Sequence, residues 1–157
     1  MKKTKSITQA AIIAALYVVL TFVANAMGLA SGAIQIRLSE ALTILPYFTP
    51  AAIPGLFVGC LLSNILVGGI IWDIIFGSLA TLIGAVGTYA LRKFKWLAPL
   101  PPILSNTITV PLVLIYAYGV QDALPYLMAT VGIGEVISAG VLGMILLKSL
   151  EKHKKIF

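Results

Sequence analysis

Long apolar segments separated by clusters of basic residues constrain this chain more than any other feature. Of its 157 residues, 60% are hydrophobic and only 10% are charged, whereas a soluble domain carries about 25% charged residues. The first apolar segment, residues 7–27, is long enough to cross the hydrocarbon core of a bilayer, which takes about 20 residues. Because lipid offers backbone groups no hydrogen-bond partner, such segments predict an all-α membrane protein.

The remaining apolar segments differ in length. Residues 35–48 are too few to span a bilayer upright and contain a proline, so we expect a short or broken second helix. Pro99, Pro101 and Pro102 predict a stiff connection before the fifth helix. The chain is thus predicted to form a single domain, residues 1–157, with a bundle of six transmembrane helices at residues 7–27, 35–48, 51–67, 72–91, 103–118 and 124–150.

The net charge of +6 is concentrated in three clusters that flank apolar segments. They comprise Lys2, Lys3 and Lys5; Arg92, Lys93 and Lys95; and Lys148, Lys152, Lys154 and Lys155. Six crossings place all three clusters on the side that holds both termini, and the positive-inside rule makes that side cytoplasmic. The distribution therefore favours a membrane protein with cytoplasmic N- and C-termini over a protein that binds nucleic acid.

The sequence lacks the motifs of common catalytic sites. It contains no phosphate-binding loop of the form GxxxxGK[ST], no HExxH and no GxSxG. The single histidine, His153, lies in the basic tail, and the single cysteine, Cys60, lies among apolar residues. We therefore predict a protein that is not an enzyme and that holds no metal or cofactor of its own.

Glu135 is the one charged residue in an otherwise apolar or small stretch, residues 123–147. A carboxylate at the centre of a membrane helix costs about 2.5–3.5 kcal/mol on insertion scales, and ionisable groups at that depth usually serve function. We predict that Glu135 contacts a ligand. The alternatives are a structural ion pair with Arg37 and a hydrogen bond to a hydroxyl group of the fifth helix.

Other polar and aromatic side chains are predicted to face the same outer half of the membrane. A carboxylate can accept two parallel N–H bonds from a guanine-like edge, and aromatic rings can stack on a planar heterocycle. Ligand pockets combine apolar walls with a few such groups. The candidate substrate-binding residues are Gln35, Arg37, Glu40, Asn64, Trp72, Asp73, Asn106, Tyr116 and Glu135.

Several of these candidates have structural alternatives. Arg37 and Glu40 can pair at the spacing (i, i+3). Asp73 can stabilise the N-terminus of the fourth helix through the helix dipole. Asn64 can be a residue at the C-terminus of its helix, and Asn106 can form a hydrogen bond in helix packing. Tyr118 and Tyr126 are predicted to belong to the aromatic belt at the membrane interface.

Small residues recur four apart near the start of the first helix. Such a stripe lets another helix approach closely, and composition alone favours packing within the bundle. The residues concerned are Ala10, Ala11, Ala14 and Ala15.

Four stretches resemble the queuosine-precursor transporter (QueT) family. They are residues 39–50 (SEALTILPYFTP), 52–56 (AIPGL), 73–81 (DIIFGSLAT) and 96–102 (WLAPLPP). The resemblance extends over nearly the whole chain.

This resemblance implies the substrate-binding (S) component of an energy-coupling factor (ECF) transporter in the plasma membrane of a prokaryote. Such a component captures a queuosine precursor of the 7-deazaguanine class from outside. The implied partners are a transmembrane coupling protein and two cytoplasmic ATPases, which would bind the ATP. The alanine stripe is then implied to dock on the coupling protein, and rotation of the loaded subunit in the membrane releases the ligand inside.

Two other functions remain open from the residues. The chain could be an S component for another vitamin-like heterocycle. It could also be a self-sufficient proton-coupled carrier or channel in which Glu135 is the titrating group, although we see no inverted repeat of the kind that carriers often contain.

Overall fold

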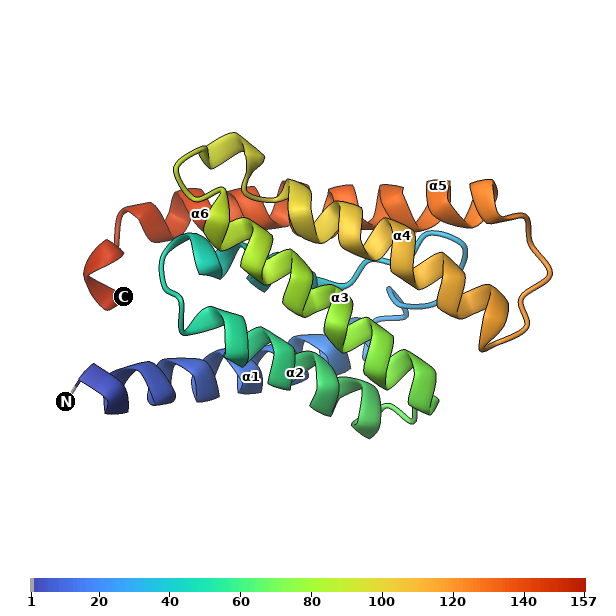
Figure 1. Ribbon diagram of the computed structural model, residues 1–157, viewed down its shortest axis with the longest axis horizontal. Coiled ribbons are helices and arrows are strands. Elements are labelled where there is room, and N and C mark those ends of the chain that lie inside the picture. The colour runs from blue at the N-terminus through green and yellow to red at the C-terminus, as the bar shows by residue number, and fades with distance from the viewer. Residues whose placement is uncertain (1) are drawn as a thin grey trace.

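The computed structural model describes residues 2–157, and within them it contains helices and no strands. The chain order, shown in Figure 1, is α1 (Lys2–Ala26), the 3-10 helix η1 (Leu38–Tyr47), α2 (Ala52–Leu66), α3 (Ile71–Ala90), the short η2 (Lys95–Leu97), α4 (Leu100–Tyr116), α5 (Leu124–Glu135), the π-helical segment η3 (Val136–Leu142), α6 (Gly143–Glu151) and η4 (Lys154–Ile156). α5, η3 and α6 follow one another without a break, so they form one long helix.

Four helical segments are long and apolar enough to cross a membrane. They are Lys3–Ala26, Ile71–Ala90, Lys95–Tyr116 and Leu124–Glu151. α2 has 15 residues, or about 22 Å at 1.5 Å per residue, and is shorter than the hydrocarbon core of about 30 Å. The all-α prediction is confirmed, and the second predicted helix, residues 35–48, is short as expected, because it forms the ten-residue η1. The number of crossings stays a prediction.

Three of the predicted helix boundaries were wrong. η1 begins at Leu38, three residues after the predicted start of the second helix. α4 begins at Leu100 because Pro101 and Pro102 occupy its first turn. The backbone N–H groups of a first turn have no acceptor within the helix, so proline, which lacks this group, is tolerated there. These prolines therefore start the helix and do not form a separate connection. α1 begins at Lys2, five residues before the predicted start, because its polar first turn extends the helix beyond the apolar stretch.

η1 forms the centre of the bundle. Seven of its ten residues are buried, and it packs against α1, α2, α3, η3 and α6. Ile44 is fully buried and shares a cluster with Leu147 of α6. A short helix that is covered on every side does not show a single apolar stripe. The polar residues of η1 must therefore find partners inside the protein.

Two glycines bring α2 close to α1. A Cβ atom on Gly55 would lie 2.7 Å from the carbonyl oxygen of Ala10, and one on Gly59 would lie 3.1 Å from Cα of Ala14. Ala14 is accordingly only 7% exposed. The alanine stripe is thus divided between two surfaces, because residues one position apart lie roughly 100° apart around a helix. Ala14 packs inside the bundle and Ala10 lies half-buried at the same contact, while the predicted docking role of the stripe stays a prediction.

The other two alanines of the stripe, Ala11 and Ala15, are exposed. They lie one position after Ala10 and Ala14 and face away from α2. This half of the stripe remains free to contact another helix.

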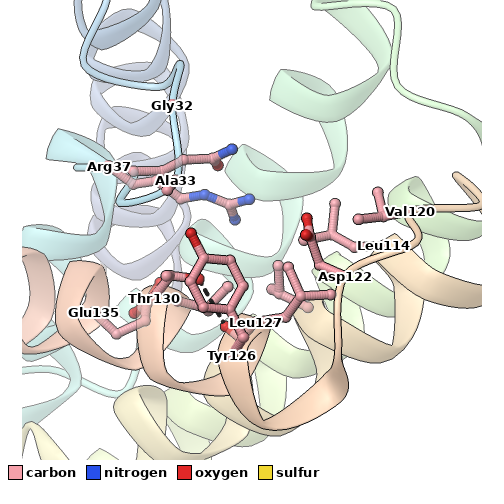
Figure 2. Close-up of a pocket in the computed structure, with 13 residues that line it drawn as sticks. Gly32, Ala33, Arg37, Leu114, Val120, Asp122, Tyr126, Leu127, Thr130 and Glu135 are labelled. Atoms are coloured by element: carbon pink, nitrogen blue, oxygen red, sulfur yellow. Dashed lines mark hydrogen bonds between the residues drawn. The ribbon is translucent and has the colours of Figure 1, made fainter.

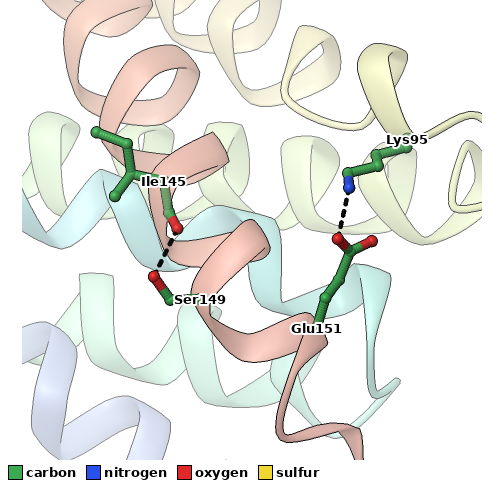
Figure 3. A network of polar contacts seen from close by, with 4 residues as sticks. All are labelled: Lys95, Ile145, Ser149 and Glu151. Carbon is green, nitrogen blue, oxygen red and sulfur yellow. Dashed lines mark hydrogen bonds and ion pairs between the residues drawn. The ribbon is translucent and has the colours of Figure 1, made fainter.

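The basic clusters meet at one end of the bundle. Figure 1 shows both termini and the connection between α3 and α4 at this end. The Nζ atom of Lys5 donates to the main-chain oxygen of Phe157 at 3.0 Å, and Lys95 forms an ion pair with Glu151 (Figure 3). The structure thus gathers the clusters as the positive-inside pattern predicts. The cytoplasmic orientation of this end stays a prediction.

The α1–α2 contact predicts the effect of enlarging the alanine stripe. We expect Ala14→Leu to destabilise the protein by about 1–3 kcal/mol, because the added side chain overpacks the contact with Gly59. Ala15→Leu is the matched control and should leave the melting temperature in detergent nearly unchanged. Equal melting temperatures for the two variants would contradict the packing assigned to Ala14.

Candidate functional site

A cavity of about 370 Å³ lies between the segment 27–37, α4 and α5 (Figure 2). Its size falls within the range of about 300–1,000 Å³ that is usual for small-molecule sites. Aliphatic side chains form much of its wall: Val110, Leu114, Val120, Leu127 and Val131. Its polar lining consists of Gln35, Arg37, Asp122, Tyr126, Thr130 and Glu135. The structure therefore brings together three of the predicted site residues, Gln35, Arg37 and Glu135.

Glu135 is buried at the cavity and incompletely paired. Its side chain is 3% exposed, and its Oε2 atom has no hydrogen-bond partner. A buried carboxylate oxygen without a donor is costly, so native structures rarely keep one unless a ligand or water supplies the donor. Because this atom belongs to a residue that lines the cavity, a ligand with N–H groups can satisfy it.

The segment that carries Gln35 and Arg37 lies directly against the helix of Glu135. A Cβ atom on Gly134 would overlap the carbonyl oxygen of Gln35, so only glycine permits this approach. The main-chain N–H of Arg37 donates to Oγ of Ser138 at 3.0 Å. These two contacts fix the polar segment on the face of the helix that presents Glu135.

The guanidinium group of Arg37 forms no ion pair. Among residues 3–157, the single ion pair with N···O within 4.0 Å joins Lys95 and Glu151. Neither structural alternative, a direct pair of Arg37 with Glu135 or with Glu40, is formed. The cavity thus contains a guanidinium group and a carboxyl group that are both available to a ligand.

The helix changes its hydrogen-bonding pattern immediately after Glu135. Val136–Leu142 is π-helical, whereas the helix is regular before and after it. Such π segments are rare and frequently occur at functional sites. Ser138, which accepts from Arg37, lies within this segment.

Glu40 has a different environment from Glu135. It is 1% exposed, and its Oε1 accepts a hydrogen bond from the hydroxyl of Tyr17 while its Oε2 accepts one from Nδ2 of Asn106 at 3.1 Å. Neither Glu40 nor Asn106 lines the cavity. Both oxygens are thus engaged within the protein, so the structure places these two predicted residues in a structural network that connects α1, η1 and α4.

Asn64 and Asp73 line a second, smaller cavity of about 170 Å³. Gln35 and Arg37 line both cavities and separate them. Asp73 lies in the first turn of α3, as the helix-dipole alternative requires, and its Oδ2 accepts from the hydroxyl of Tyr118 at 3.1 Å. Partial burial and the nearby Asp73 charge raise the pKa of this tyrosine.

Trp72 and Tyr116 do not join the polar cavity. They line an apolar groove of about 610 Å³ between α3 and α4, where Trp72 stacks on Phe76. Tyr116 is 85% exposed. It follows Leu114 by two residues, and roughly 200° of helix rotation turns it away from the cavity that Leu114 lines. Neither aromatic ring is in a position to stack on a ligand held at Glu135.

Several residues of the site were not predicted from the sequence. Tyr126, which was predicted to be a belt residue, lines the cavity together with Thr130. Their spacing of four residues, followed by Glu135, marks a helix face that could have been identified from the sequence. Tyr17 was also missed, because no sequence signal connects it with a carboxylate 23 residues away.

The family comparison agrees with this architecture. Residues 7–152 match the family described as QueT transporter. The chain belongs to the QueT transporter family. The resemblance found in the sequence is therefore confirmed, and with four long apolar helices this QueT family member is a multi-pass membrane protein.

One curated relative is the queuosine precursor transporter QueT of Lactococcus lactis subsp. cremoris (strain MG1363). It is 38% identical over 99 residues, which cover 60% of this chain and 57% of the relative. The match therefore spans somewhat more than half of the relative's length. No solved structure matches the chain.

The network around Glu40 predicts a stability effect that is separate from ligand binding. We expect Tyr17→Phe to destabilise the protein by about 1–3 kcal/mol, because a buried carboxylate oxygen loses its donor. Tyr118→Phe is the control. It removes a hydroxyl that donates to a carboxylate in an exposed position, so we expect only a small loss of stability. Thermal unfolding in detergent measures both, and similar small shifts would refute the assigned role of Glu40.

Proposed function

We propose that this chain captures a queuosine precursor of the 7-deazaguanine class and serves as the S component of an ECF-type importer. The observation that carries the proposal is the buried Glu135 carboxylate, whose Oε2 atom lacks a partner at a cavity of about 370 Å³. The name of the Lactococcus relative supports the choice of substrate class.

The proposed recognition follows from the donors and acceptors of a guanine-like ring. Its N–H and amino groups lie side by side, and a carboxylate accepts both in a bidentate pair. Its neighbouring carbonyl oxygen needs a donor, which Arg37 or Gln35 would supply from the other side of the cavity. The aliphatic wall would cover the faces of the ring, in place of the aromatic stacking that the sequence predicted.

Precursors that differ at the 7-position would be distinguished at the polar wall. An aminomethyl group is cationic and needs an anionic or carbonyl partner. Asp122 lines the same cavity on the side opposite to Glu135 in Figure 2 and is the candidate for this contact. Glu40 is not, because both of its oxygens are already engaged.

The energy for uptake would come from partner subunits. The sequence has no phosphate-binding loop, so ATP would be bound by two cytoplasmic ATPases that act through a transmembrane coupling protein. The exposed Ala11 and Ala15 are the proposed contact with that coupling protein. A self-sufficient carrier would instead transport without these partners.

Glu135→Gln tests the ligand role. We expect at least tenfold weaker binding of the preferred 7-deazaguanine, because a neutral amide replaces a charge-assisted acceptor that is worth about 1.5–3 kcal/mol. Calorimetric titration of the purified protein with guanine, 7-cyano-7-deazaguanine, its aminomethyl analogue and queuine provides the measurement.

Glu151→Gln, which removes a carboxylate at the opposite end of the bundle, should bind like wild type. Unchanged affinity in Glu135→Gln would disprove the assigned contact. Binding of none of the four compounds by the wild type would favour another vitamin-like heterocycle.

Ala15→Leu tests partner docking. We expect normal ligand affinity but loss of co-purification with the coupling protein and loss of cellular uptake, because a bulky side chain separates the two helices. Val86→Leu enlarges an exposed side chain on α3 and should leave both properties intact. Uptake at the wild-type rate by Ala15→Leu would remove the docking role.

A further inference from the structure

A further polar recess lies at the basic end of the bundle. It shares no lining residue with the two cavities described above. It is a groove of about 390 Å³ between the end of η1, the end of α3 and the C-terminal segment. Its lining consists of Tyr47, Phe48, Arg92, Lys93, Lys154 and Phe157. Three cationic and three aromatic side chains therefore line the same groove, and the proposed transport function uses none of them.

The aromatic side chains of the groove are well packed. The rings of Tyr47 and Phe48 meet edge to face with centroids 5.0 Å apart, and Phe48 stacks on Phe157 at 5.2 Å. The main-chain oxygen of Phe157 accepts a hydrogen bond from Lys5, which ties the C-terminal segment to α1. These contacts connect three separate parts of the chain and give the groove a defined floor.

Within the described residues, the cations of the groove form no ion pair with an Asp or Glu side chain. No carboxylate side chain lines it, and Glu151, the acid nearest to these basic clusters in the sequence, is engaged by Lys95 (Figure 3). Arg92 lies 3.9 Å above the ring of Tyr89 and donates one N–H to the Tyr89 carbonyl. Guanidinium carries five N–H donors, so the oriented group keeps donors for an anion.

The surroundings place the groove at the surface of a bilayer. Phe94 and Trp96 in the adjoining connection are 61% and 71% exposed, and exposed aromatic side chains beside basic residues are typical of the interface region. Phe157 also lines a second groove, of about 270 Å³, whose walls are leucine and isoleucine side chains of α1, η1 and α6. A cationic recess and an apolar groove thus adjoin at one residue.

We propose that the cationic groove binds the phosphate group of an anionic phospholipid, with an acyl chain in the adjoining apolar groove. Arginine and lysine recognise phosphate through charge-assisted hydrogen bonds, and basic pockets between transmembrane helices on the cytoplasmic side bind anionic headgroups. The apolar groove distinguishes a lipid from a free anion or an acidic peptide, because neither of those carries an acyl chain.

The test measures thermal unfolding of the purified full chain in a neutral detergent, with added phosphatidylglycerol, phosphatidylcholine or inorganic phosphate. The groove variant is Arg92→Gln/Lys154→Gln. The control variant is Lys152→Gln/Lys155→Gln, which removes the same charge from two exposed residues that do not line the groove. Lys154→Gln alone serves if the double variant does not fold.

We expect phosphatidylglycerol to raise the melting temperature of wild type and control more than phosphatidylcholine does. The groove variants should lose at least half of that difference, and inorganic phosphate should have no comparable effect. Equal responses of groove and control variants would overturn the proposal and reduce the effect to general surface charge.

Two further outcomes would also overturn it. A shift of the same size with inorganic phosphate would indicate a small-anion site. Loss of partner co-purification in the groove variant, with an unchanged lipid response, would assign the groove to an acidic protein surface. The ligand titrations at Glu135 are independent of all these results, so the two proposals can fail separately.

Discussion

The buried carboxylate of Glu40 holds the centre of this protein in place. A charge in a low-dielectric interior is tolerable when both of its oxygens have donors, and here Tyr17 comes from α1 and Asn106 from α4. Since Glu40 itself lies in η1, three parts of the chain are fixed relative to one another by one side chain. The position of η1 in turn sets where the preceding segment, residues 35–37, meets the last long helix.

Two glutamates at similar burial therefore differ in their hydrogen bonding. The Glu40 oxygens are satisfied within the fold, and this network stabilises the bundle without any ligand. Glu135 retains an oxygen without a donor, and Arg37 lies at the same cavity without a counter-ion within 4.0 Å. The free-energy cost of an unpaired buried oxygen is tolerable only when the rest of the fold is stable. The hydrogen bonds of Glu40 contribute to that stability, and the unpaired oxygen of Glu135 lies at the candidate site.

The sequence predicted features that depend on composition along the chain. The apolar segments, the short second helix and the gathering of basic clusters follow from local hydropathy and charge, and the unusual Glu135 is visible as a lone charge. Features that depend on the direction of a side chain were harder to predict. Ala14 and Ala15 differ by one position, and only the packing of neighbouring helices decides which of them is covered. For the same reason, Trp72 and Tyr116 could not be separated from the polar set.

The π-helical segment after Glu135 sets the rotational register of the last long helix. A π segment accommodates about one residue more than a regular helix of the same number of turns, and each residue corresponds to roughly 100° of rotation. The π segment therefore rotates α5 relative to α6, compared with an uninterrupted α-helix. This rotation sets which face of α5 meets the cavity while α6 packs Leu147 into the core. Insertions or deletions in Val136–Leu142 would re-aim the cavity wall while α6 stays anchored, so this short segment allows the binding face to vary independently of the core.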